Sequence, residues 1–141
     1  MKNTIIIGSI ALVLLVGGSW WTRSLQGSSN AVSQDGLHWH PTLEIFVKGE
    51  KIEIPESLGL GAVHKPMHTH EDLPVIHLEF SGVVHEKDLM LGQFFKNWER
   101  DMNSFGTNMS MTVNGETNTL YGKYVMRDGD RIELRYECGD S

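Results

Sequence analysis

Hydrophobic and polar residues alternate with a period of two over residues 37–47, the pattern of a β-strand with one buried face. The apolar residues of one parity in this stretch are Trp39, Leu43, Ile45 and Val47. Lys48-Gly49 then forms a tight turn, and the alternation resumes at Ile52 and Ile54. The pattern predicts a β-hairpin, with the first strand at a sheet edge or bulged at Pro41 because proline has no N–H to donate.

The same alternation predicts three later strands. Residues 75–80 place Ile76, Leu78 and Phe80 on one face, and residues 109–113 lead into Asn114-Gly115, a common hairpin turn. Residues 131–137 form the last predicted strand. Its inward positions are Ile132, Leu134 and Tyr136.

One segment has helical spacing instead. Apolar residues recur every three or four positions in residues 89–102, and Asp88 before them is a plausible N-cap. The stretch NSFG at 103–106 is expected to end this helix. The apolar positions are Leu91, Phe94 or Phe95, Trp98 and Met102.

This order of elements predicts one small α+β domain at 37–141, in which one main helix covers a mixed β-sheet. The closing segments MTVNG (111–115) and VMRDGDRIELRY (125–136) resemble the last part of a β-grasp (ubiquitin-like) domain. The resemblance is one of fold, and it implies no function.

The N-terminal region has a different composition. Residues 5–21 are 17 residues without a charge, long enough for a short membrane span, and Trp20-Trp21 suits a membrane interface. We expect residues 1–22 to be an uncleaved transmembrane anchor and the polar residues 23–36 a flexible linker. A cleavable signal peptide with small residues at 17–19 is the alternative.

Both N-terminal interpretations place the rest of the chain outside the cytoplasm. The expected location is therefore the cell membrane, single-pass, with an extracytoplasmic C-terminal domain. The bias of positive charge is slight, since only Lys2 and Arg23 flank the apolar run, so a cytoplasmic domain is a minor alternative.

Charge and cysteine content narrow the classes of function. From residue 24 onward, 10 Lys and Arg residues stand against 18 Asp and Glu, a net charge of −8. This excess argues against nucleic acid and anionic lipid as partners and suits cations. The one cysteine, Cys138, allows no intramolecular disulfide and no C-x-x-C pair, which excludes thiol–disulfide chemistry within the chain. We interpret it as a bystander.

The histidines are the residues that indicate chemistry. HKPMHTH (64–70) has the i, i+4 spacing of helical zinc motifs, but Pro66 excludes a helix there. On the predicted strands, His38 and His40 share a face with Glu44, and His77 shares one with Glu79, in both cases opposite the core. The candidate ligands for copper or zinc are His38, His40, His64, His68, His70 and His77.

Other residues give weaker indications. Met67, Met109 and Met111 offer thioethers for copper(I), although Met109 and Met111 fit core positions of a strand better. Glu71 and Glu79 are candidates for a general base or for orienting the imidazoles. His85 stands apart, and we interpret it as a surface residue. Ordinary surface histidines that titrate with pH remain the alternative for the whole set.

Four segments together resemble a group of small membrane-anchored, His-rich proteins of archaea and reduced-genome bacteria, and they cover the whole predicted domain. The resemblance implies a shared site and no particular activity. The segments are HWHPTLEIFVKGEKIEIP, HKPMHTH, VIHLEF and LGQFFKNW.

Three functions follow as hypotheses. The first is a membrane-tethered extracytoplasmic domain that binds copper or zinc for storage, delivery or sensing. The second is a zinc-dependent hydrolase or lyase with Glu79 or Glu71 as base. The third is a non-catalytic interaction module that uses a strand edge to recruit an envelope protein, whose identity the sequence does not indicate.

Overall fold

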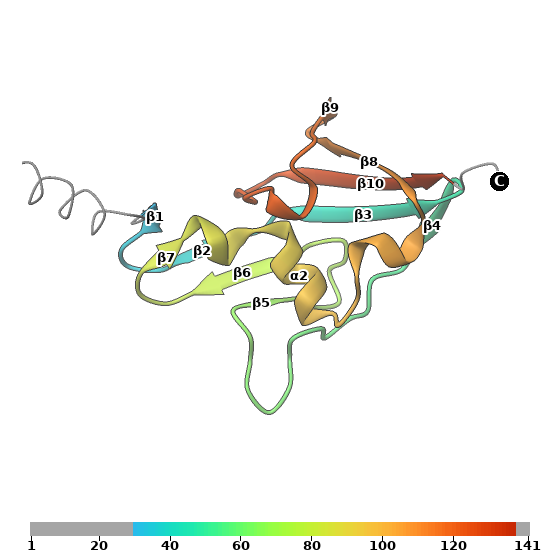
Figure 1. Cartoon of the computed structure of the whole chain (residues 1–141). Coiled ribbons are helices and arrows are strands. Elements are labelled where there is room, and N and C mark those ends of the chain that lie inside the picture. Colours follow the sequence, from blue (N-terminus) through green and yellow to red (C-terminus); the bar gives the residue numbers. More distant parts are fainter. Residues whose placement is uncertain (1–29, 138–141) are drawn as a thin grey trace, which may run out of the picture. The chain divides into compact units, whose positions relative to one another are not determined.

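The computed structural model describes residues 30–137 (Figure 1). The predicted anchor at 1–22, residues 23–29 of the predicted linker and Cys138 lie outside the described residues. The elements are β1 Ala31–Ser33, β2 Leu37–Trp39, β3 Thr42–Val47, β4 Glu50–Ile52, β5 Met67–His68, β6 His77–Phe80, β7 Val84–His85, η1 Glu86–Leu89, α2 Leu91–Asn97, η2 Met102–Phe105, β8 Asn108–Val113, β9 Glu116–Thr117, η3 Tyr121–Lys123 and β10 Arg131–Glu137.

The strands form three sheets. A five-stranded sheet has the order β4-β3-β10-β8-β9, in which β3 and β10 run parallel and the other pairs are antiparallel. A three-stranded antiparallel sheet has the order β2-β6-β5, and β1 pairs with β7. The mixed sheet and the single α-helix that residues 30–137 contain confirm the predicted α+β class.

The prediction of a single sheet was wrong, and the reason lies at His40-Pro41. Residues 37–47 do not form one bulged strand: the chain leaves the three-stranded sheet after β2 and enters the five-stranded sheet at β3. The carbonyl of Pro41 accepts the Ile76 N–H at 2.8 Å, and the Thr42 N–H donates to the carbonyl of Asp130 at 2.7 Å. Pro41 therefore marks a change of partner strands rather than a bulge.

Both predicted hairpin turns are present. Lys48 and Gly49 have φ angles of 52° and 83°, and Asn114 and Gly115 have φ angles of 54° and 86°. Positive φ at both central residues is typical of a type I′ turn, whose twist matches that of the flanking strands. These turns set the registers of β3 with β4 and of β8 with β9.

The helix is shorter than predicted. Asp88 does not cap it: the Asp88 carboxylate accepts the His85 N–H at 2.9 Å and so starts η1, and α2 begins at Leu91. At the other end Glu99 has φ 57°, and its backbone N–H donates to the Lys96 carbonyl. The Arg100 N–H donates to the Phe95 carbonyl. This is a Schellman ending with a glutamate where glycine is usual, which the residue pattern did not predict.

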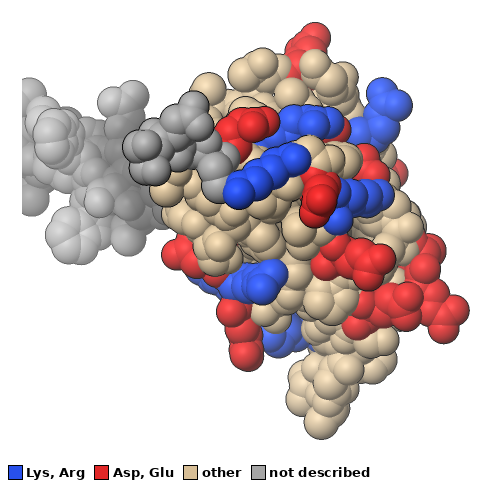
Figure 2. Space-filling model, turned by 90° about the vertical axis from the view of Figure 1, so that its right-hand side faces the viewer, with Lys and Arg blue, Asp and Glu red and all other residues tan. Residues whose placement is uncertain are grey.

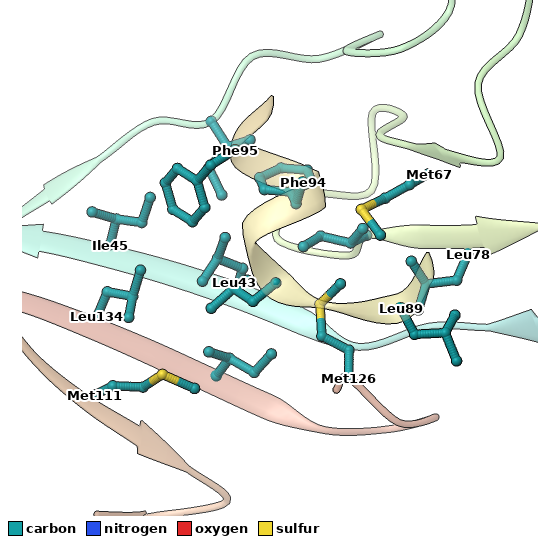
Figure 3. Close-up of a cluster of buried hydrophobic side chains, with 14 of the residues drawn as sticks. Leu43, Ile45, Met67, Leu78, Leu89, Phe94, Phe95, Met111, Met126 and Leu134 are labelled. Carbon is teal, nitrogen blue, oxygen red and sulfur yellow. The ribbon is translucent and has the colours of Figure 1, made fainter. Parts of the chain in front are cut away.

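The core lies where the sheets and α2 meet. Figure 3 shows Leu43, Ile45 and Leu134 of the five-stranded sheet directed toward Phe94 and Phe95 of α2. Met67 and Leu78 of the three-stranded sheet belong to the same cluster. One continuous core thus fixes the position of the three-stranded sheet, including its outer face.

The N-terminal part of the described chain is more structured than predicted. Ala31–Ser33, expected in the flexible linker, form β1, and a compact unit begins at Ala31 rather than at residue 37. Within residues 30–137 no helix has the length and apolar character needed to span a membrane. Figure 2 shows acidic and basic side chains interspersed over the upper part of the drawn face, with several acidic side chains gathered at its lower right.

Candidate metal centre

The three-stranded sheet directs imidazoles to one face. In the antiparallel registers, His68 of β5 lies opposite His77 of β6, and His38 of β2 lies opposite Glu79 of β6. Directly opposed residues project to the same side of a sheet. The alternate residues Met67 and Leu78 are buried in the core on the other side, so the burial of apolar residues sets the face that the histidines occupy.

Two more histidines flank these strands. His40 follows β2, and its N–H donates to the Asp128 carboxylate at 2.8 Å, in the turn that precedes β10. His70 follows β5, and the residue between it and His68 is the fully buried Thr69. The Thr69 hydroxyl donates to the Pro55 carbonyl at 2.8 Å and accepts the Leu58 N–H at 3.0 Å. These bonds anchor the segment that carries His68 and His70.

The five imidazoles form a continuous cluster. Ring centroids lie 4.7 Å apart for His38 and His40 and 4.9 Å apart for His40 and His77. On the other side of His77, the distances are 4.7 Å to His70 and 5.6 Å to His68, and His68 and His70 are 4.9 Å apart. We call these residues the histidine cluster.

The histidine cluster contains two sets of three that could each hold a metal ion. The outer triad is His38, His40 and His77, and the inner triad is His68, His70 and His77. In each triad, one ring nitrogen of every member lies within 4.8 Å of those of the others. His77 belongs to both triads.

Hydrogen bonds fix which nitrogen is free in two of the rings, and an ion-pair contact involves a third. His68 Nδ1 lies 3.0 Å from the Lys65 carbonyl, which can only accept, so Nδ1 carries the proton and Nε2 offers a lone pair. His77 Nε2 lies 3.1 Å from both Asp72 carboxylate oxygens, and His38 Nε2 lies 3.1 Å from Glu79 Oε1. By the same reasoning His77 offers Nδ1. A metal-ligating histidine is commonly oriented by such an acceptor on its other nitrogen.

Two pKa shifts accompany this arrangement. Burial lowers the pKa of His68 below its ordinary value, because a charged imidazole would lose hydration there. The hydrogen bond from His77 lowers the pKa of the Asp72 carboxyl. Both shifts favour the forms that metal binding needs, a neutral ring at His68 and an acceptor carboxylate at Asp72.

The other predicted site residues lie elsewhere. His64 is exposed on the loop between β4 and β5 and is in neither triad. This loop extends to the bottom of Figure 1. Glu71 is exposed and in neither triad. Glu44 does not share the face of the histidines, because it lies on the five-stranded sheet, where its Oε1 is 2.5 Å from Lys51 Nζ. His85 lies on β7 and is also outside both triads.

The donor types in the histidine cluster fit a divalent ion. Met67 and Met111 are buried in the core, at 2% and 1% exposure, so the thioethers that copper(I) favours are not at the triads. Neutral imidazoles suit zinc(II) and copper(II), and each triad supplies three of them. Residues His38, His40, His68, His70 and His77 would hold the ion.

Asp72 is the site residue that the sequence did not reveal. It stands in a loop between β5 and β6, where no periodicity relates it to His77, so only the folded loop brings the two together.

Comparison of the chain with protein-family models, curated proteins and solved structures found no match.

Proposed function

We propose that this chain is a membrane-tethered extracytoplasmic protein that binds copper(II) or zinc through the histidine cluster. The single observation that carries the proposal is the convergence of five imidazoles on one side of a three-stranded sheet, with both triads meeting at His77. Storage, delivery or sensing of the ion would all use such a site.

A physical argument separates this proposal from a set of ordinary surface histidines. Protonated imidazoles at centroid distances of 4.7–5.6 Å would repel one another, and neutral ones gain little from being adjacent. Two of them are also oriented by hydrogen-bond acceptors on one nitrogen, at Lys65 and Asp72, and His38 Nε2 lies 3.1 Å from Glu79. A bound cation makes this arrangement favourable, because the lone pairs of the triad that holds it then have a partner.

The tether and the location rest on sequence. The uncharged run at 5–21 supports a membrane anchor, and the acidic balance of the rest supports a role with cations. The strand order β4-β3-β10-β8-β9, with β3 and β10 parallel, supports a β-grasp-like five-stranded sheet. Membership of the membrane-anchored His-rich group belongs to the same proposal.

The test is a metal titration of the full chain, purified in detergent and stripped with a chelator. Calorimetry with zinc(II) or copper(II) should show stoichiometric binding that the double variant His68→Ala/His70→Ala loses. His64→Ala is the matched control, since it removes an exposed histidine outside both triads and should bind as the wild type does. Absence of saturable binding of both ions by the wild type would refute the proposal.

A zinc hydrolase or lyase is the second candidate. Two observations favour it: three ligands per triad leave a coordination position open, and a hollow of about 520 Å³ lined in part by His38 and Glu79 adjoins the outer triad. Glu79 is then the base, and exposed Glu71, which is in neither triad, is the weaker choice. Turnover of an activated ester by the zinc-loaded protein, lost in Glu79→Gln with zinc affinity kept, would establish this activity.

A further inference from the structure

The two triads cannot be described as two independent sites, because both need His77. An imidazole binds a metal ion through the lone pair of an unprotonated nitrogen, and a neutral ring has only one such nitrogen. The number of lone pairs on His77 therefore decides whether the triads act together or in turn.

Asp72 limits His77 to one lone pair. Both Asp72 carboxylate oxygens lie 3.1 Å from His77 Nε2, and a carboxylate at this distance accepts the Nε2 proton. Nδ1 is left as the only donor of His77. Two ions bound at once would require an imidazolate, without the Nε2 proton that Asp72 holds, and would also place two divalent charges close together. The geometry thus favours one ion in one triad at a time.

The two triads differ in exposure. The inner triad includes His68, which is 4% exposed and held by the Lys65 carbonyl. In the outer triad, the side chain of His38 is 61% exposed, and its partner Glu79 is 44% exposed. An ion in the outer triad is therefore accessible to ligands from solution, whereas an ion in the inner triad is bound in part by a side chain fixed in the fold.

We propose that the histidine cluster carries one divalent ion in two alternative positions, with the exposed outer triad for loading and release and the inner triad for retention. This inference rests on the proposed function. In the transfer step, the bonds from the ion to His38 and His40 break as bonds to His68 and His70 form. His77 stays bound throughout, and neither a proton nor an electron moves between the ion and the protein.

The same asymmetry indicates the class of donor or acceptor. A carrier that offers one or two nitrogen or oxygen ligands, such as a free amino acid or a His-bearing protein surface, can reach the outer triad while His77 still holds the ion. Exchange then passes through mixed coordination by protein and carrier, and a free aqua ion is not needed. The protein would deliver its ion by ligand exchange at the outer triad.

The experiment compares equilibrium and rate for the full chain in detergent, with zinc(II) as the probe. His38→Ala removes an exposed ligand of the outer triad, and His70→Ala removes an exposed ligand of the inner triad, so neither variant disturbs the core. Calorimetry gives stoichiometry and Kd, and stopped-flow transfer of the ion to a chelator gives the release rate. His64→Ala is again the control.

We expect one ion per chain in the wild type. His70→Ala should weaken binding by about tenfold or more, equivalent to about 1.4 kcal/mol for each tenfold. His38→Ala should change Kd by no more than about threefold and slow release about tenfold. The variant slows loading and release together, so the ratio of the two rates, which sets Kd, is kept.

Three results would overturn the inference. Two ions per chain would indicate a dinuclear centre. Equal loss of affinity in His38→Ala and His70→Ala would indicate a single site that uses ligands of both triads at once. An unchanged release rate in His38→Ala would contradict the role of the outer triad in release. Failure of the wild type to bind zinc at all would instead remove the proposed function itself.

Discussion

The two larger sheets of this domain have the same alternation of apolar and polar residues but use their polar faces differently. On the five-stranded sheet, opposite charges pair: Lys51 with Glu44 at 2.5 Å and Arg135 with Glu133 at 2.6 Å. The Arg135 guanidinium also lies 4.5 Å from the centroid of the Phe46 ring. Two pairs of opposite charge therefore stand on the polar face of this sheet.

On the three-stranded sheet, histidines predominate on the polar face, with Glu79 opposite His38. His68, His77 and His38 share it, and His40 and His70 join them from the strand ends. Exposed ion pairs contribute little to stability, and neighbouring neutral imidazoles gain little from one another. The difference supports the proposal that the three-stranded sheet carries the metal-binding face, while the five-stranded sheet serves mainly the fold.

The largest expected effect comes from a substitution that removes core volume from the five-stranded sheet. It tests whether stability and metal binding depend on different sheets. Leu134 is fully buried on β10, and Leu134→Ala should lower the free energy of unfolding by about 3 kcal/mol, since it leaves a cavity. Urea unfolding would measure the loss. Zinc affinity per folded molecule should stay as in the wild type; a matching loss of affinity would show that the two sheets are not separable.

The next effect removes the residue that both triads share. His77→Ala should weaken zinc binding by about 100-fold, because neither triad then keeps three imidazoles, and each tenfold corresponds to about 1.4 kcal/mol. Calorimetry would check it, with His64→Ala as the control for loss of a histidine elsewhere. A loss no greater than that of His38→Ala would contradict the position of His77 at the centre of the cluster.

A smaller effect tests the Asp72 carboxylate, which accepts the Nε2 proton of His77. Asp72→Asn should weaken binding about tenfold, because an amide no longer holds the Nε2 proton as strongly and the ring is less well oriented. Stability should change little, since the Asp72 side chain is 55% exposed. Competition with a chelating dye would measure the affinity. Asp35→Asn, at an exposed acid outside both triads, is the control.

The smallest effect concerns the metal-free protein and pH. Burial lowers the pKa of His68 below its ordinary value of 6.5, with Glu79 raising it and His70 and His77 lowering it. As pH falls below about 6.5, the unfolded chain binds a proton that the folded chain does not yet bind, so stability falls; above that pH the contribution is constant.

Urea unfolding of the metal-free chain at about pH 7.5 and about pH 5.5 would show this decrease. The variant His68→Gln should reduce the difference between the two conditions, whereas His64→Gln should keep it. An equal pH response in the wild type and His68→Gln would show that His68 does not carry the effect.

Much of the five-stranded sheet follows from local sequence. Period-two alternation placed Ile132, Leu134 and Tyr136 inward, and all three are buried. Gly49 and Asn114-Gly115 predicted the hairpin turns because glycine and asparagine adopt positive φ at low cost, and Lys48 also has a positive φ. These features depend on residues that are neighbours in the chain, so the sequence alone contains them.

The change of sheets at His40-Pro41 could not be read from alternation, because the parity continues through it. The partners of Pro41 and Thr42 are Ile76 and Asp130, which are distant in sequence. Long-range contacts decided this change of partners. The early end of α2 was missed for another reason: glutamate is uncommon at the positive φ that Glu99 adopts after the helix, so the residue pattern did not indicate it.

For the site, the sequence by itself determined that histidines avoid the core face, since H-x-H spacing and strand parity are local properties. Only the tertiary structure decided which of the six candidates meet: the registers of β2 and β5 on β6 bring five together, and the loop between β4 and β5 leaves His64 apart. It also placed Asp72 on His77 and Lys65 on His68. The physical reason is that a metal site depends on angles and distances between strands, which strand pairing and core packing set and residue spacing does not.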